Sequence, residues 1–261
     1  LRLPRRMEWE WRRDCREILG LLPLPPSLDP APPGIVVESS HCPKCGHRLA
    51  PWENIPVLSW LLLRGRCRSC RTPISMQYPV VELVTGLLAL GCALAFGASW
   101  AALAAMGFSF TLVALSGIDL RTTYLPDQLT YPLLWAGLLL SLLPDLSPLG
   151  VTPLQSILGA TVGYLSLWTV YWGFKLLTGK EGMGYGDFKL LAAIGAWLGW
   201  QVLPLTILLS SLVGAAVGIA LIVLARHGRN VPIPFGPYLA AAGVIALFWG
   251  EAITRHYLAI F

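Results

Sequence analysis

Two aspartates lie at the ends of long apolar segments, where they could act together on one water molecule. Asp119 ends one such segment, and Asp187 begins another, directly after Gly184 and Gly186. Ionisable side chains at membrane depth are costly, which makes them candidates for function. Two neighbouring carboxyl groups share a proton, so one can activate a water molecule while the other protonates a peptide carbonyl. This is aspartic protease chemistry, and the two glycines would admit a substrate backbone and adopt dihedral angles that other residues avoid.

The acidic residues also have structural interpretations. Asp187 could be the N-cap of a helix, where aspartate is favoured, and Asp119 could be a boundary residue paired with Arg121. Asp127, in the same predicted loop as Arg121, competes with Asp119 for the site and could instead cap the next helix. Lys189 could tune the proton affinity of Asp187 or extend to the lipid headgroups. The spacing alone leaves these alternatives open.

Four cysteines form two pairs whose spacing suits a metal ion. Each pair has the form C-x2-C, and 21 residues separate the pairs, slightly more than in the usual zinc ribbon. Four thiolates can complete a tetrahedral shell with no open position, so such a zinc site would be structural. The alternative is two disulfides or unpaired thiols, and a cytoplasmic location disfavours disulfides. The predicted ligands are Cys42, Cys45, Cys67 and Cys70. His41 and His47 flank the first pair and are expected to support the ligands or lie on the surface rather than bind the ion.

Composition and charge divide the chain into a polar segment and a membrane domain. The 261 residues are 55% hydrophobic and 13% charged, whereas soluble domains carry about 25% charged residues. Of the 19 lysines and arginines, 12 lie in residues 1–78. We therefore predict a cytoplasmic zinc-binding segment over 1–78, with a proline-rich stretch at 20–33, and a membrane domain over 79–261. The net charge of +5 is typical of basic residues beside membrane spans and does not indicate a nucleic acid partner.

The second part contains seven apolar segments, which predict an all-α polytopic bundle of about seven membrane spans. A helix needs about 20 apolar residues to cross the hydrocarbon core. The predicted spans are 79–97, 100–118, 128–143, 154–177, 188–200, 202–225 and 236–260. With residues 1–78 in the cytoplasm, seven crossings return Arg121, Lys180, Arg226 and Arg229 to that side. The same topology places Asp119 and Asp187 at the cytoplasmic boundary.

Several of these motifs together resemble the bacterial type IV prepilin peptidases. Gly184-Tyr185-Gly186-Asp187 matches their GxGD motif, and Ile118-Asp119 followed by Leu125-Pro126-Asp127-Gln128-Leu129-Thr130 is similar to their first aspartate region. The cysteine pairs resemble their cytoplasmic zinc loop, and Pro234-Phe235-Gly236-Pro237 resembles a late segment of the family. The resemblance covers nearly the whole chain in order, which makes it more specific than a GxGD motif alone.

The resemblance implies an enzyme of the bacterial inner membrane with two activities. One is cleavage of type IV prepilins and pseudopilins after a glycine, with Asp119 and Asp187 as catalytic residues. The other is N-methylation of the new N-terminus with S-adenosylmethionine, whose binding residues the sequence does not indicate. Zinc would be held by the four cysteines. Glu82 lies where the family carries a glutamate, so we favour a role in the site over a helix cap.

Two further expectations accompany this interpretation. Members of the family begin with a membrane helix that ends in an Arg-Leu-Pro sequence, whereas this sequence begins at Leu1-Arg2-Leu3-Pro4. We therefore expect that helix to be absent here and methyl transfer to suffer from its absence. The rival hypotheses are a transporter or channel with a cytoplasmic zinc module, whose aspartates would be ion or proton sites, and a presenilin-type protease that cuts within membrane helices.

Overall fold

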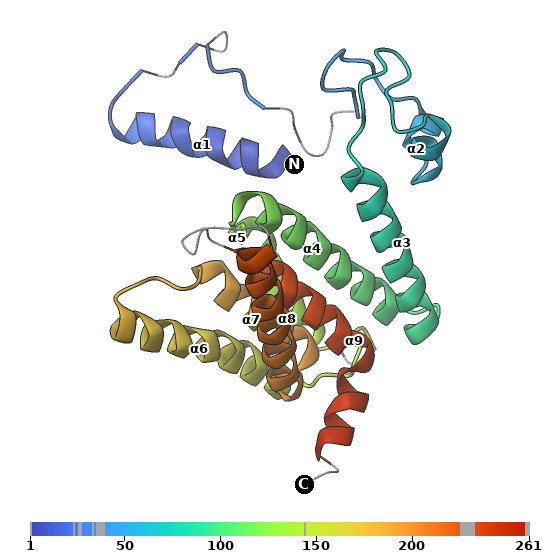
Figure 1. Cartoon of the computed structure of the whole chain (residues 1–261). Helices are drawn as coiled ribbons and strands as arrows, with labels where there is room; N and C mark the ends of the chain where they lie inside the picture. Colours follow the sequence, from blue (N-terminus) through green and yellow to red (C-terminus); the bar gives the residue numbers. More distant parts are fainter. Residues whose placement is uncertain are drawn as a thin grey trace. The chain divides into compact units, whose positions relative to one another are not determined.

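A computed structural model describes residues 2–22, 24–25, 28–32, 34, 40–143, 145–224 and 233–258, and within them the protein is helical (Figure 1). Two isolated bridges, His41 with Arg48 and Arg66 with Pro73, are the only β-type pairings in those ranges. The predicted all-α class is confirmed. The chain forms two compact units, Leu1–Val84 and Thr85–Phe261. The predicted domain boundary at residue 78 remains a prediction.

The first unit contains short elements and much irregular chain. Its helix α1 carries six arginines, and helix α2 begins after Val57, whose φ of 59° is unusual for a β-branched residue. The elements are α1 (Arg2–Ile18), the 3₁₀ turn η1 (Pro51–Asn54), α2 (Leu58–Leu62) and the start of α3 (Gln77–Phe96). Among the described residues of this unit, the buried hydrophobic side chains are Cys42 and Cys67.

The second unit consists of long helices with clear local signals at several ends. Ser99 accepts a hydrogen bond from Ala102 N, which begins α4, and a Thr152–Gln155 capping box begins α6. Gly179, in the left-handed conformation, ends α6. The helices after α3 are α4 (Trp100–Thr122), α5 (Asp127–Leu140), α6 (Pro153–Thr178), α7 (Tyr185–Leu198), the turn η2 (Trp200–Val202), α8 (Leu203–Leu224) and α9 (Gly236–Leu258).

The prediction of seven membrane spans is confirmed only in part. Each of the seven apolar segments forms a helix where the structure describes it. Within the described ranges, four stretches are long and apolar enough to cross a membrane: Gln77–Phe96, Trp100–Thr122, Trp200–Leu221 and Gly236–Arg255. Helices α5 and α7 have 14 residues each, about 21 Å, against a hydrocarbon core of about 30 Å. Seven crossings therefore remain a prediction, and Arg226 and Arg229, which helped to orient them, lie outside the described residues.

Helix α7 is the centre of the second unit. It packs against α5, α6 and α9, and 11 of its 14 residues are buried. Its contact with α6 is close because two glycines face each other: a Cβ atom on Gly159 would lie 2.0 Å from the Gly195 oxygen. On the α5 side, Trp197 Nε1 donates to the Leu133 carbonyl oxygen at 2.7 Å. This packing determines where the first turn of α7, with Asp187, lies.

Candidate active site

Asp119 lies in the last turn of α4 and is held by the start of α9. Thr123, at φ 50°, ends α4 and donates its N–H to the Asp119 carbonyl oxygen at 2.8 Å. The Asp119 side chain is 4% exposed, and its Oδ2 accepts a hydrogen bond from the main-chain N–H of Gly236 at 2.9 Å. The two residues are 117 positions apart, so tertiary packing alone brings them together.

Asp187 lies in the first turn of α7 and is 7% exposed. Gly184 is the N-cap of this helix, and its carbonyl oxygen accepts from Asp187 N at 3.2 Å. The interpretation of Asp187 as the N-cap is therefore wrong, because Tyr185 and Gly186 precede it within the helix. A buried carboxyl group that does not cap its own helix is available for other chemistry.

Leu125 packs against a residue beside each of the two aspartates. A Cβ atom added to Gly186 would lie 2.8 Å from Leu125 Cβ, and one added to Gly236 would lie 3.2 Å from Leu125 Cδ2. Leu125 thus packs on the residue before Asp187 and on the residue that binds Asp119. Buried acidic side chains from α4 and α7 therefore lie beside residues that pack against the same leucine.

The two glycines of the GxGD motif serve packing more than unusual backbone geometry. Gly184 has φ −82° and ψ 149°, values open to any residue. Gly186 is helical, and its requirement comes from Leu125, which leaves no room for a side chain. The expectation that these positions need special dihedral angles is wrong for both glycines, since neither has a positive φ. Space for a substrate backbone beside them remains a prediction.

Lys189 and Asp127 form an ion pair next to the aspartates. The Lys189 ammonium donates to both Asp127 carboxylate oxygens, at 2.6 and 2.8 Å, and lies 4.9 Å from the centre of the Tyr131 ring. The pair joins the start of α5 to the first turns of α7. Asp127 is thus engaged by a cation. The alternative that it caps the third span is wrong, because Pro126 is the N-cap of α5 and Asp127 is its first residue.

Glu82 belongs to the first unit and binds a main-chain amide there. Its Oε2 accepts a hydrogen bond from Val57 N at 2.7 Å. Val57 has the positive φ noted above, so the carboxylate stabilises a backbone conformation that a β-branched residue otherwise disfavours. The structure thus gives Glu82 a structural contact, and its predicted role in the site remains a prediction.

The four predicted cysteine ligands gather around one point. Their sulfur atoms lie within 4.8 Å of one another, with Cys42 and Cys70 3.8 Å apart and Cys45 and Cys67 3.9 Å apart. Four thiolates at about 2.3 Å from a tetrahedral ion are about 3.8 Å apart. The arrangement therefore fits a metal ion, and each C-x2-C pair lies on the same kind of turn. In these turns Cys42 N donates to His47 O, and Cys67 N donates to Thr72 O, both at 2.9 Å.

Glu53 joins the two cysteine turns. It is 7% exposed and accepts from Ala50 N at 2.8 Å, and its Oε2 lies 3.2 Å from His47 Nε2. Its Oε1 lies 3.9 Å from Arg68 Nη1. The Ala50 amide, followed by His47 and Arg68, holds the pKa of Glu53 below its ordinary value. His47 thus contacts a carboxylate that supports the metal site, as its predicted supporting position allows.

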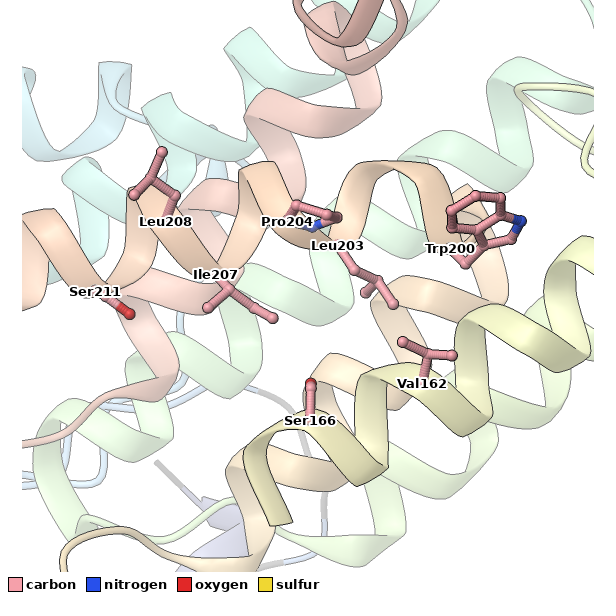
Figure 2. Close-up of a pocket in the computed structure, with 8 residues that line it drawn as sticks. All are labelled: Val162, Ser166, Trp200, Leu203, Pro204, Ile207, Leu208 and Ser211. Carbon is pink, nitrogen blue, oxygen red and sulfur yellow. The ribbon is translucent and has the colours of Figure 1, made fainter. Parts of the chain in front are cut away.

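An apolar cavity of about 540 Å³ lies away from these groups (Figure 2). It is lined by Val162 and Ser166 of α6, Trp200 of η2 and the first turns of α8. The described residues around it include no ionisable side chain. Trp200 follows the C-terminal end of α7, whereas Asp187 lies at the N-terminal end. This cavity is therefore separate from the aspartate site, and its lining is mostly apolar.

Comparison with known proteins now decides the family. Residues 106–219 match the type IV leader peptidase family, and residues 2–96 match the bacterial peptidase A24 N-terminal domain. A protein of Aeromonas hydrophila named prepilin leader peptidase/N-methyltransferase is 56% identical, over 100% of this chain and 88% of the relative. The chain belongs to the type IV leader peptidase family. Two more proteins of the same name, from Xanthomonas campestris and Pseudomonas aeruginosa, are 55% and 52% identical, over 99% and 98% of this chain and 88% and 86% of each relative.

Membership of the leader peptidase family confirms the predicted resemblance and the prediction of an enzyme. It favours the peptidase over the transporter or channel, and with the four apolar helices it indicates a membrane protein. No solved structure matches the chain.

Two residues of the sites escaped sequence reasoning. Gly236 was noticed only as part of a resembling segment, because nothing in the sequence connects its amide with Asp119. Glu53 was not noticed at all. A signal for Glu53 exists. It follows Pro51 in a short turn between the cysteine pairs, and it is the only acidic residue in 46–66.

Proposed function

We propose that this chain is a leader peptidase that cleaves type IV prepilins and pseudopilins with Asp119 and Asp187 as its catalytic pair. The observation that carries the proposal is that both carboxyl groups are buried, on α4 and α7, beside glycines that pack against the same side chain, Leu125. Family membership and the names of the relatives supply the substrate class. The transporter hypothesis has no comparable support.

The chemistry requires one ionised and one protonated carboxyl group. The carboxylate takes a proton from a water molecule as the water oxygen bonds to the scissile carbonyl carbon, while the carboxylic acid protonates the carbonyl oxygen. The resulting diol then collapses. One hydroxyl returns its proton to the second carboxylate, the C–N bond breaks, and the amine nitrogen takes the proton held by the first aspartate. The pair ends in its starting state, and no residue becomes covalently attached to substrate.

The neighbouring residues support this pair in the proposed enzyme. Gly184 carries no side chain beside Asp187, whose Oδ2 would lie 3.8 Å from a Cβ atom there, and Gly186 makes room for Leu125. The Lys189–Asp127 ion pair holds the start of α5 against α7. The site lies at the cytoplasmic face of the bacterial inner membrane, a placement that rests on the distribution of lysine and arginine.

The segment 1–78 is proposed to be a cytoplasmic zinc-binding domain, and 79–261 the membrane peptidase domain in contact with lipid. Four thiolates, all from cysteine and spaced for a tetrahedral ion, favour zinc. Its role is structural because the four sulfurs leave no open position. The second proposed activity is N-methylation of the cleaved product, for which S-adenosylmethionine supplies the methyl group.

The proposal is tested with purified protein and a prepilin substrate. Asp119→Asn and Asp187→Asn should each lower the cleavage rate by about 10²- to 10⁴-fold, because each removes one half of the acid–base pair. Asp145→Asn is the matched control, since Asp145 is exposed and lies in another loop. Cleavage that survives in either catalytic variant at the control rate would refute the assignment.

Two further measurements complete the test. Mapping the cleaved bond separates a leader peptidase from a presenilin-type protease, because the latter cuts within a membrane helix. Transfer of labelled methyl groups to a pilin that has already been cleaved tests the second activity separately from the first. Absence of this transfer would leave a peptidase without methyltransferase activity.

A further inference from the structure

The hydrogen bond between α9 and Asp119 has a consequence for catalysis. We infer that the main-chain N–H of Gly236 positions the Asp119 carboxylate for reaction, and that residue 236 must lack a side chain for this to occur. The inference rests on the proposed function, because it gives Asp119 a task. It adds a positioning residue from a segment 117 positions away in the sequence.

The first turn of α9 explains why this amide is available. The first N–H groups of a helix have no partner within the helix. Tyr238 N and Leu239 N both donate to Phe235 O, at 3.1 and 3.2 Å, and Pro237 has no N–H. Gly236 N is therefore the amide of this turn that needs an acceptor from elsewhere. Asp119 Oδ2 supplies it at 2.9 Å in a buried position.

The space around Gly236 explains the need for glycine. A Cβ atom at this position would lie 2.7 Å from Asp119 Oδ2 and 3.3 Å from Asp119 Cγ. It would also lie 3.2 Å from Leu125 Cδ2, so Leu125 closes the other side. A methyl group could fit only if the carboxylate moved. Its effect would therefore fall on the side chain proposed to react.

The hydrogen bond also assigns different tasks to the two carboxylate oxygens. Oδ2 is engaged by the amide and cannot turn freely, which leaves Oδ1 for the water molecule. Hydrogen bonds to a charged acceptor are stronger than those between neutral groups, so the amide holds Asp119 in one orientation before substrate binds. Orientation fixed in advance contributes substantially to catalysis.

The first test compares Gly236→Ala with Gly117→Ala. Gly117 lies on α4 two residues before Asp119, and a Cβ atom there would meet nothing within 4 Å. Gly236→Ala should lower kcat by about 10²-fold, the effect of displacing a reacting group by about 1 Å, with KM for the prepilin nearly unchanged. Gly117→Ala should keep the wild-type kcat and KM.

Thermal stability in detergent separates positioning from folding. Both variants should melt within a few degrees of the wild type. A wild-type kcat in Gly236→Ala would overturn the inference. So would a loss of activity that comes with an equally clear fall in melting temperature, because Gly236 would then serve only the packing of α9.

A second test does not depend on cleavage. Residue-resolved hydrogen exchange should show the Gly236 amide exchanging about ten-fold faster or more in Asp119→Ala than in the wild type, because a charged acceptor has been removed. The Leu239 amide, which donates to Phe235 O, is the control and should not change. Unchanged exchange at Gly236 would overturn the inference.

The two tests distinguish failure of the inference from failure of the proposed function. If the wild type cleaves prepilin but Gly236 exchange does not respond to Asp119→Ala, only the inference is refuted. If the wild type cleaves no prepilin although the exchange responds as expected, the proposed function is refuted. The positioning role would be overturned with it, because Asp119 would have no cleavage to perform.

Discussion

The cysteine site and the aspartate site are built in opposite ways. The four cysteines lie within 29 consecutive residues, on two similar turns that are joined by Glu53. The aspartates and Gly236 come from α4, α7 and α9 and are separated by up to 117 positions. The first site has little apolar core around it, whereas the second lies in closely packed helices.

This difference shows what holds each site in place. The four sulfur atoms of the first site are spaced as ligands of one metal ion, and the zinc proposed above would hold the two turns together. The carboxyl groups of the second site are held by glycine contacts between helices and by a main-chain hydrogen bond. Loss of metal should therefore damage one unit, and changes in helix packing the other.

Removal of the proposed zinc should have the largest effect on stability. A first unit that stays folded without metal would contradict the comparison. Binding of structural zinc contributes about 10–16 kcal/mol in small peptide domains, which is as large as the whole stability of a typical domain. Cys67→Ser, or treatment with a chelator, should therefore unfold the first unit. Hydrogen exchange over residues 40–78 should become fast, while exchange in α7 stays slow. Cys15→Ser, outside the cluster, is the control.

Tighter packing between α6 and α7 should have the next largest effect. Gly159→Ala places a methyl group 2.0 Å from the Gly195 oxygen, and overpacking of this kind costs about 1–3 kcal/mol. The melting temperature of the membrane unit and the cleavage rate should both fall, with metal content unchanged. Gly173→Ala, also on α6 but facing open space, should be neutral. Equal effects of the two variants would contradict the packing described here.

Glu53→Gln should sharpen the account of the metal site. The variant keeps the size of the side chain but removes the charge that faces His47 and Arg68. Loss of a group that supports metal ligands lowers metal affinity by about 10- to 100-fold. Zinc should pass to a competing chelator correspondingly faster, and cleavage should change little at saturating zinc. Glu8→Gln, an exposed change in α1, is the control, and equal release rates would disprove the role of Glu53.

The ion pair between Lys189 and Asp127 should have the smallest effect. Asp127 is 44% exposed and Lys189 21%, and exposed pairs contribute about 0–1 kcal/mol because solvent screens them. Asp127→Asn should therefore lower stability by less than about 1 kcal/mol and retain most cleavage. A double-mutant cycle with Lys189→Met measures the coupling. Loss of cleavage in Asp127→Asn as complete as in Asp119→Asn would show that Asp127 also takes part in the chemistry and does more than pair with Lys189.

Much of the architecture could be predicted because its signals are local. Each apolar segment became a helix, and the C-x2-C spacing placed four sulfurs together. The number of crossings was harder, since α5 and α7 are apolar but only 14 residues long. Such a segment can be a core helix as well as a span, and composition does not distinguish the two. The contacts of Lys189 were also undetermined, because a long side chain has several partners within reach.

The sequence by itself determined the helical class, the two cysteine pairs and the identity of the acidic residues worth considering. These follow from apolar run length, from spacing along the chain and from the cost of charge at membrane depth. Only the tertiary structure decided that Gly236 binds Asp119 and that Asp127 pairs with Lys189. It also decided that Leu125 packs against both Gly186 and Gly236. Those contacts join residues 60 or more positions apart, and they depend on how helices pack, which no local pattern specifies.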